Sequence, residues 1–182
     1  MEPSHDLENS LALLARFPSV LDTLLRDMPE VWTKRNEGGE TYSPLVVVSH
    51  LIHAERLDWV PRVQCILEHG DSRELPRFDR DPEESDRLNK TVEQLLEQFA
   101  TLRAENLQRL RALNLQESDL ARRGRHPKFG TVTLSQLLAT WAAHDLTHLH
   151  QISRTMAHQY REAVGPWTAF LGVMHCNGHS EA

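Results

Sequence analysis

The stretch from Thr133 to Gly165 constrains the fold most, because it has the pattern of one long amphipathic helix. Thr133 is followed three residues later by Gln136, a capping-box arrangement that marks a helix start. Gly165-Pro166 predicts the helix end, since glycine favours a left-handed cap and proline cannot continue a helix. Between these ends, apolar residues and two histidines recur at the spacing of one helical face: Leu134, Leu137, Trp141, His144, His148, Ile152 and Met156. Two histidines on an apolar face require a chemical explanation.

Two earlier segments show the same helical period, and each contains a proline. The first covers residues 7–28, and we expect either a kink or two abutting helices at Pro18. The second opens at Ser43-Pro44, with the serine as cap and the proline at the first helical position. It should continue to near Gly70 with a bend at Pro61, because proline cannot donate the backbone hydrogen bond of a helix interior.

A further helical segment begins at Thr91, which forms a second capping box with Gln94, and continues to about Leu113. Four long helical segments and no convincing strand predict an all-α four-helix bundle. Residues 71–85 form the longest connection and are expected to cross over the bundle or over a site. The remaining assignments are links at 29–42 and 114–130, a short C-terminal helix at Trp167–Met174 and a flexible tail at 175–182.

Length, charge and cysteine content narrow the class of protein. A chain of 182 residues that is 40% apolar is expected to form one domain, 1–182. The net charge of −6, with acids and bases interspersed, argues against a nucleic-acid partner. No apolar run approaches the roughly eighteen residues of a membrane span, and the polar start from Met1 to Asp6 lacks the apolar core of a signal peptide. Cys65 and Cys176 form no disulfide framework, so we expect a reducing cytoplasm.

His144 and His148 are suited to binding one metal ion together. They lie one helical turn apart, and a neutral imidazole is a good ligand for zinc, nickel or iron. A third ligand must come from another helix, and His50, on the apolar stripe of the second segment, is our candidate. His53, one turn away, is its main competitor. The alternative interpretation is that His144 and His148 are hydrogen-bonded core histidines or belong to a partly solvated face, because a spacing of four residues arises by chance in a chain with 11 histidines.

The sequence resembles the DinB-like, or YfiT-like, metal-dependent family. The resemblance is carried by Ser49-His50-Leu51 with Glu55-Arg56 and by the run from Trp141 to Ile152. Further support, in the order expected for the family, comes from Pro76-Arg-Phe78-Asp79, His126-Pro127, Gly130-Thr-Val-Thr-Leu134 and Tyr160 with Gly165-Pro166-Trp167. The resemblance implies a DinB-like four-helix bundle of up-down-down-up connectivity, a long crossover between helices two and three, and frequently a homodimer.

The resemblance also implies a three-histidine metal site, whose ligands fall on His50, His144 and His148. Three residues are candidates for support around these ligands. Glu55 lies about 140° round the helix from His50, which favours a buried ion pair or a contact behind the ligands. Asp145 should point elsewhere, towards an arginine. Gln151, one turn beyond His148, is placed either to hydrogen-bond a bound water or to pack.

We therefore expect a divalent-metal-binding protein with a small-molecule substrate. Zinc and nickel are the first expectations for the ion, and iron is a third. The resemblance suggests two reactions, metal-dependent hydrolysis and thiol transfer with a low-molecular-weight thiol, and the sequence does not choose between them. In either, the ion would lower the pKa of a bound water or thiol. The alternative is a non-catalytic, stress-associated binding or interaction protein in which the metal is structural or absent.

Overall fold

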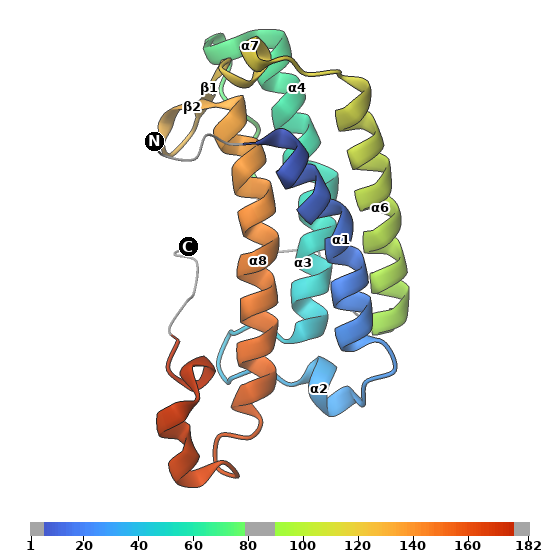
Figure 1. The fold of residues 1–182 in the computed structure, drawn as a ribbon, viewed down its shortest axis with the longest axis vertical. Coiled ribbons are helices and arrows are strands. Elements are labelled where there is room, and N and C mark those ends of the chain that lie inside the picture. Colours follow the sequence, from blue (N-terminus) through green and yellow to red (C-terminus); the bar gives the residue numbers. More distant parts are fainter. Residues whose placement is uncertain (1–5, 79–89, 177–182) are drawn as a thin grey trace.

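The computed structural model describes residues 6–78 and 90–176, and it confirms the four-helix bundle (Figure 1). Each long helix begins where a capping residue satisfies the first backbone N–H groups. The side chains of Thr91 and Thr133 both form the predicted capping boxes, with Gln94 and Gln136. The long helices are α1 (Leu7–Leu25), α3 (Pro44–Leu57) continued by α4 (Trp59–His69), α6 (Val92–Ala112) and α8 (Leu134–His158).

The helix directions give the expected connectivity. In Figure 1, α1 and α8 run one way along the bundle, whereas α3, α4 and α6 run the other way. The chain therefore leaves α4 at one end of the bundle, through the short 3₁₀ turn η1 (Gly70–Ser72), and α6 begins with Val92 at the other end. This is the expected crossover, of which residues 79–89 lie outside the described part of the chain.

The two helix-interior prolines have different outcomes. The predicted bend near Pro61 takes the form of a break at Asp58 (φ −100°, ψ −67°), which separates α3 from α4. The break precedes the proline because its ring obstructs the carbonyl one turn earlier. By contrast, α1 continues through Pro18 as a single helix, so the alternative of two abutting helices is wrong.

A β-hairpin corrects the prediction that the chain has no strand. Strands β1 (Arg123–His126) and β2 (Gly130–Thr133) pair antiparallel within the segment that we expected to be a link. The hairpin contacts α4: a Cβ placed on Gly124 would lie 2.6 Å from Cγ1 of Ile66. The strands are short and mostly exposed, so they lack the alternation of apolar and polar residues that predicts a strand. Two short helices, α2 (Glu30–Lys34) and α7 (Glu117–Leu120), also fall within predicted links.

The last long helix ends at His158 rather than near Gly165. The amides of Gln159, Tyr160 and Arg161 bond to carbonyls three residues back, at 2.9–3.1 Å, so the helix tightens and loses its regular ladder. Gly165 does adopt the left-handed conformation (φ +51°). The predicted short final helix is a pair of 3₁₀ segments, η2 (Gly165–Phe170) and η3 (Gly172–Met174). Of the expected tail, residues 177–182 lie outside the described residues.

The core consists of two apolar clusters with polar side chains between them. One cluster includes Leu14, Trp59 and Trp141, and the other includes Phe17, Phe99 and Ile152. Along α6 and α8, buried polar residues lie between the part of the helix that packs in one cluster and the part that packs in the other. On α8 these polar residues belong to the candidate metal site or lie next to it. None of the described helices is both long enough and apolar enough to cross a membrane.

Candidate metal centre

Three histidines from two helices converge inside the bundle. His50 comes from α3, and His144 and His148 come from α8. The Nε2 atom of His144 lies 3.4 Å from Nε2 of His50 and 3.0 Å from Nε2 of His148. One ring nitrogen from each histidine lies within 4.8 Å of the other two, and among the described residues no other group of three metal-ligating side chains is this compact. We call these residues the histidine triad.

The structure places His50, rather than its competitor His53, in the triad. The imidazole of His53 packs against Phe78, with ring centroids 5.1 Å apart. The His50 ring also contacts Phe78, edge-on at 5.9 Å, but it lies 4.7 Å from the His148 ring as well. His50 and His53 therefore flank one aromatic ring, and only His50 belongs to the described group of three.

Aromatic rings surround the triad, and two of its members are buried. The rings of Tyr42 and Trp59 lie 6.1 Å from His50 and 5.1 Å from His144, respectively. His50 is 5% exposed and His148 is 7% exposed, whereas His144 is partly open to solvent. His144 is therefore the least buried member of the triad.

A hydrogen bond fixes the tautomer of His148. Its Nδ1 lies 2.8 Å from Oε1 of Gln151, and an amide oxygen only accepts, so Nδ1 carries the hydrogen and donates. The lone pair is then on Nε2, the atom that faces His144. Burial, assisted by the charge of His50 and opposed by the Gln151 hydrogen bond, lowers the pKa of His148 to about 4. The ring is therefore neutral at physiological pH, as a metal ligand must be.

The triad fits a divalent cation. Zinc–imidazole bonds of about 2.0–2.1 Å in a tetrahedral site imply that the ligand nitrogens are separated by roughly 3.3 Å. The measured separations of 3.0 and 3.4 Å around His144 are close to this value. Three neutral imidazoles suit zinc, copper, iron or nickel. Three protein ligands also leave a coordination position open, which is the arrangement of catalytic rather than structural zinc sites.

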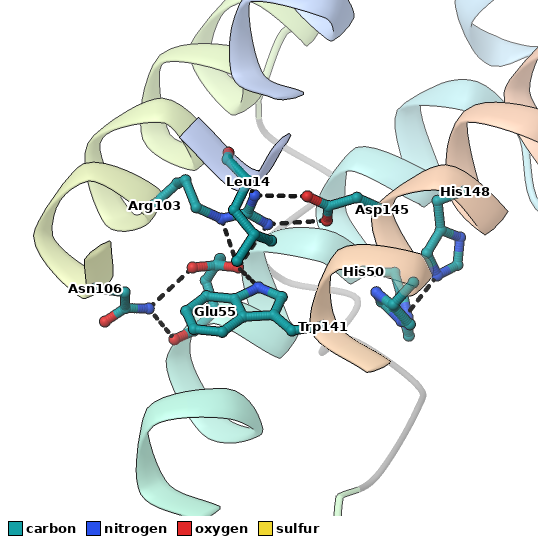
Figure 2. A network of polar contacts seen from close by, with 9 residues as sticks. Leu14, His50, Glu55, Arg103, Asn106, Trp141, Asp145 and His148 are labelled. Atoms are coloured by element: carbon teal, nitrogen blue, oxygen red, sulfur yellow. Dashed lines mark hydrogen bonds and ion pairs between the residues drawn. The ribbon is translucent and has the colours of Figure 1, made fainter. Parts of the chain in front are cut away.

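A buried ion network lies beside the triad (Figure 2). The Arg103 guanidinium on α6 binds Asp145 in a bidentate pair of 2.6 and 2.9 Å. It also donates twice to Oε1 of Glu55, at 2.8 and 3.0 Å, and once to the carbonyl of Leu14, at 2.9 Å. Burial raises the pKa of Asp145 to about 6, although the hydrogen bonds from Arg103 oppose this rise.

The three residues that we expected to support the metal ligands make different contacts. Glu55 and Asp145 both bind Arg103, so the ion pair that we expected of Glu55 and the arginine that we expected for Asp145 involve the same guanidinium. Gln151 contacts the His148 ring itself, which differs from both the bound water and the packing role that we considered.

The sequence interpretation missed Arg103 and Asn106, both of which are buried. Asn106 donates from Nδ2 to the carboxylate and to the backbone carbonyl of Glu55, at 3.0 and 2.7 Å. A signal was available: Phe99, Arg103, Asn106 and Leu110 recur four, three and four residues apart, so the two polar residues share the apolar face of α6.

Helices α3, α4 and α6 run parallel, and the triad lies between α3 and α8. This arrangement defines a helical bundle of the kind that builds metal sites from side chains on facing helices. The chain belongs to the DinB superfamily, which matches residues 13–152. Its fold is similar to that of YfiT from Bacillus subtilis, which is described as a probable metal-dependent hydrolase with an unusual four-helix bundle topology. The TM-score is 0.73 and the identity 17%, over 90% of this chain and 91% of that one. At that identity the likeness establishes the fold. None of the curated proteins compared matches the chain.

Proposed function

We propose that this protein is a metal-dependent hydrolase of a small molecule, with His50, His144 and His148 holding one divalent cation. The observation that carries the proposal is that Nε2 of His144 lies at the separations of a tetrahedral site, 3.4 and 3.0 Å, from Nε2 of His50 and of His148, with one ring nitrogen of each histidine within 4.8 Å of the others. Membership of the DinB superfamily and the description of YfiT are consistent with it. When bound, such a cation lowers the pKa of a water ligand to about 7 and so supplies a nucleophile at neutral pH.

The chain's own residues prepare this chemistry. Gln151 keeps the proton of His148 on Nδ1, which leaves the Nε2 lone pair available for the cation. The Trp59 and Phe78 rings pack edge-on against His144 and His50 and exclude water from those faces. Because these neighbours are aromatic, we expect a substrate with an apolar part next to its scissile bond.

Hydrolysis is preferred to thiol transfer because a further histidine lies near the triad. His53 lies one turn after His50 and packs on the same Phe78 ring, so it is the candidate general base for the attacking water. A thiol-transfer site would instead need cationic or polar groups to hold the thiol cosubstrate. Of the buried cations in the described residues, Arg103 is fully engaged by Glu55, Asp145 and Leu14, and Arg154 is paired with Glu37.

Metal content is the first test. Elemental analysis of purified wild type should find about one zinc, nickel or iron ion per chain, and His144→Ala and His148→Ala should lack it. His150→Ala is the matched control, since His150 is on the same helix but outside the triad. Equal metal in wild type and His144→Ala would contradict the proposal.

Measurements of turnover then distinguish hydrolysis from thiol transfer. Model esters and amides should be hydrolysed without added thiol, and His53→Gln should lower kcat while metal content stays the same. Turnover that requires a low-molecular-weight thiol would instead identify a thiol transferase. A metal-loaded protein in which His148→Ala lowers only the melting temperature would support the non-catalytic alternative.

A further inference from the structure

The Arg103 guanidinium contacts every long helix of the bundle. Its side chain is 1% exposed, and its five N–H donors meet five acceptor contacts: two on Glu55, two on Asp145 and one on the carbonyl of Leu14. These partners belong to α3, α8 and α1, and Arg103 itself belongs to α6. Because the guanidinium is planar and all of its N–H groups are bonded, it fixes the rotation of each contacting helix about its own axis.

This contact lies next to the metal ligands on both helices that supply them. Asp145 immediately follows His144 on α8, and Glu55 lies on α3 with His50. A rotation of α8 that broke the Asp145 pair would carry His144 and His148 away from His50, because side chains on one helix turn together.

A second path leads from the same network to His144. Trp141 donates from Nε1 to Oε1 of Glu55 at 3.0 Å. Its ring stacks on Trp59, with centroids 5.6 Å apart and 7° between the planes. Trp59 in turn packs edge-on against His144 at 5.1 Å. The Glu55 carboxylate therefore positions one aromatic wall of the triad as well as the guanidinium.

Stability alone is a weak explanation for this network. Burying an arginine and two carboxylates carries a large desolvation cost, and apolar residues of similar volume often stabilise a core equally well. In some proteins, buried polar and ionic groups instead specify one arrangement of the elements that they join. Here the arrangement that is specified places three imidazoles on one point.

We propose that Arg103 is a positioning residue for the histidine triad: by holding Glu55 and Asp145 together, it sets the rotation of α8 against α3 that brings His144 and His148 opposite His50. This inference rests on the proposed metal site. It adds a residue that touches neither the cation nor the substrate but determines the affinity of the chain for the cation.

The test uses Arg103→Lys, which keeps the charge and removes the planar fork, and Asp145→Asn, which keeps the shape and removes one carboxylate. Arg154→Lys is the matched control, because Arg154 is also buried and ion-paired, to Glu37 at 2.7 Å, and lies on α8 beyond the triad. For each full-length protein, the zinc Kd is measured by competition with a chelator. The visible spectrum of the cobalt form and the melting temperature of the metal-free form are also measured.

Arg103→Lys and Asp145→Asn should raise the zinc Kd by about 10–100-fold and alter the cobalt ligand-field bands. Arg154→Lys should lower the melting temperature while its Kd and cobalt spectrum remain those of wild type. If Arg103→Lys does not fold, Asp145→Asn decides the matter, because Arg103 then keeps Glu55. A wild-type Kd and spectrum in folded Arg103→Lys or Asp145→Asn would overturn the inference alone. Zinc binding by wild type no tighter than by His144→Ala would overturn the proposed function and this inference with it.

Discussion

His148 and Gln151 are joined by a hydrogen bond across one turn of α8, with 2.8 Å between Nδ1 and Oε1. The bond determines which nitrogen of His148 faces the triad, so it should contribute to metal affinity without contributing a ligand. Residues in this position behind a metal-bound histidine typically affect affinity by about 10–100-fold.

Replacing Gln151 with leucine should therefore raise the zinc Kd by about 10–100-fold, because neither tautomer of His148 is then preferred. The measurement is competition with a chelating dye at pH 7. Gln159→Leu is the control, since Gln159 directly follows the same helix but bonds to Asn36 and Thr155. An unchanged Kd in Gln151→Leu would show that the hydrogen bond does not orient the ligand.

Zinc should stabilise the wild type and leave triad variants unchanged. A ligand at about 100 times its Kd adds about 2.7 kcal/mol to the free energy of unfolding, which for a domain of this size raises the Tm by roughly 5–10 °C. Differential scanning fluorimetry with and without zinc measures the shift, and EDTA should reverse it. His144→Ala should show no shift, whereas an equal shift in that variant would place the zinc elsewhere.

Acidification should destabilise the metal-free protein through His148. The pKa of this residue is lowered to about 4, so between pH 6.5 and 4 the unfolded chain binds the proton more tightly than the folded one. The stabilising effect is complete above pH 6.5 and is lost as the pH falls to 4, by about 3 kcal/mol.

Asp145 acts in the opposite direction over nearly the same range. Burial raises its pKa to about 6, so its contribution to stability is complete below pH 3.8 and is lost as the pH rises through 6. The two effects are separated by urea unfolding of wild type against His148→Gln and against Asp145→Asn at pH 7 and pH 4.5. The wild type should lose stability relative to His148→Gln on acidification and gain it relative to Asp145→Asn. Parallel curves for wild type and His148→Gln would contradict the lowered pKa.

Adding a methyl group at Gly124 should destabilise the fold. The new Cβ would lie 2.6 Å from Cγ1 of Ile66 and 3.4 Å from Cδ2 of Leu75, so β1 would have to move away from α4. Overpacking of this kind costs about 1–3 kcal/mol. Thermal unfolding of Gly124→Ala against Gly172→Ala provides the comparison, because a Cβ on Gly172 meets nothing within 4 Å. Equal melting temperatures would show that the hairpin adjusts freely.

The sequence was sufficient for the starts of the long helices, because the signals that mark them are local. The capping boxes at Thr91 and Thr133 satisfy backbone N–H groups within one turn, and the structure contains both. The spacing of His144 and His148 placed them on one face for the same reason. Local signals failed in the hairpin, where only Val132 is a large aliphatic residue and the stability comes from contact with α4.

What the sequence left open depends on how the helices face one another. The choice between His50 and His53 required the rotation of α3 against α8, which helical spacing on α3 alone does not provide. The Arg103 network was hidden for a related reason, because a buried arginine is accommodated only when partners arrive from other helices. Arg103 and Asn106 on the apolar face of α6 were the available indication.

His50 and His144 lie 94 positions apart along the chain, yet their nitrogens are 3.4 Å apart. During synthesis on the ribosome, the chelating group cannot exist until α8 has emerged and docked against α3. A nascent chain that ends before His144 offers a cation only His50 from this group. If the triad binds metal as proposed, loading is therefore a late event in maturation, and the bound ion would add a link between the last long helix and α3.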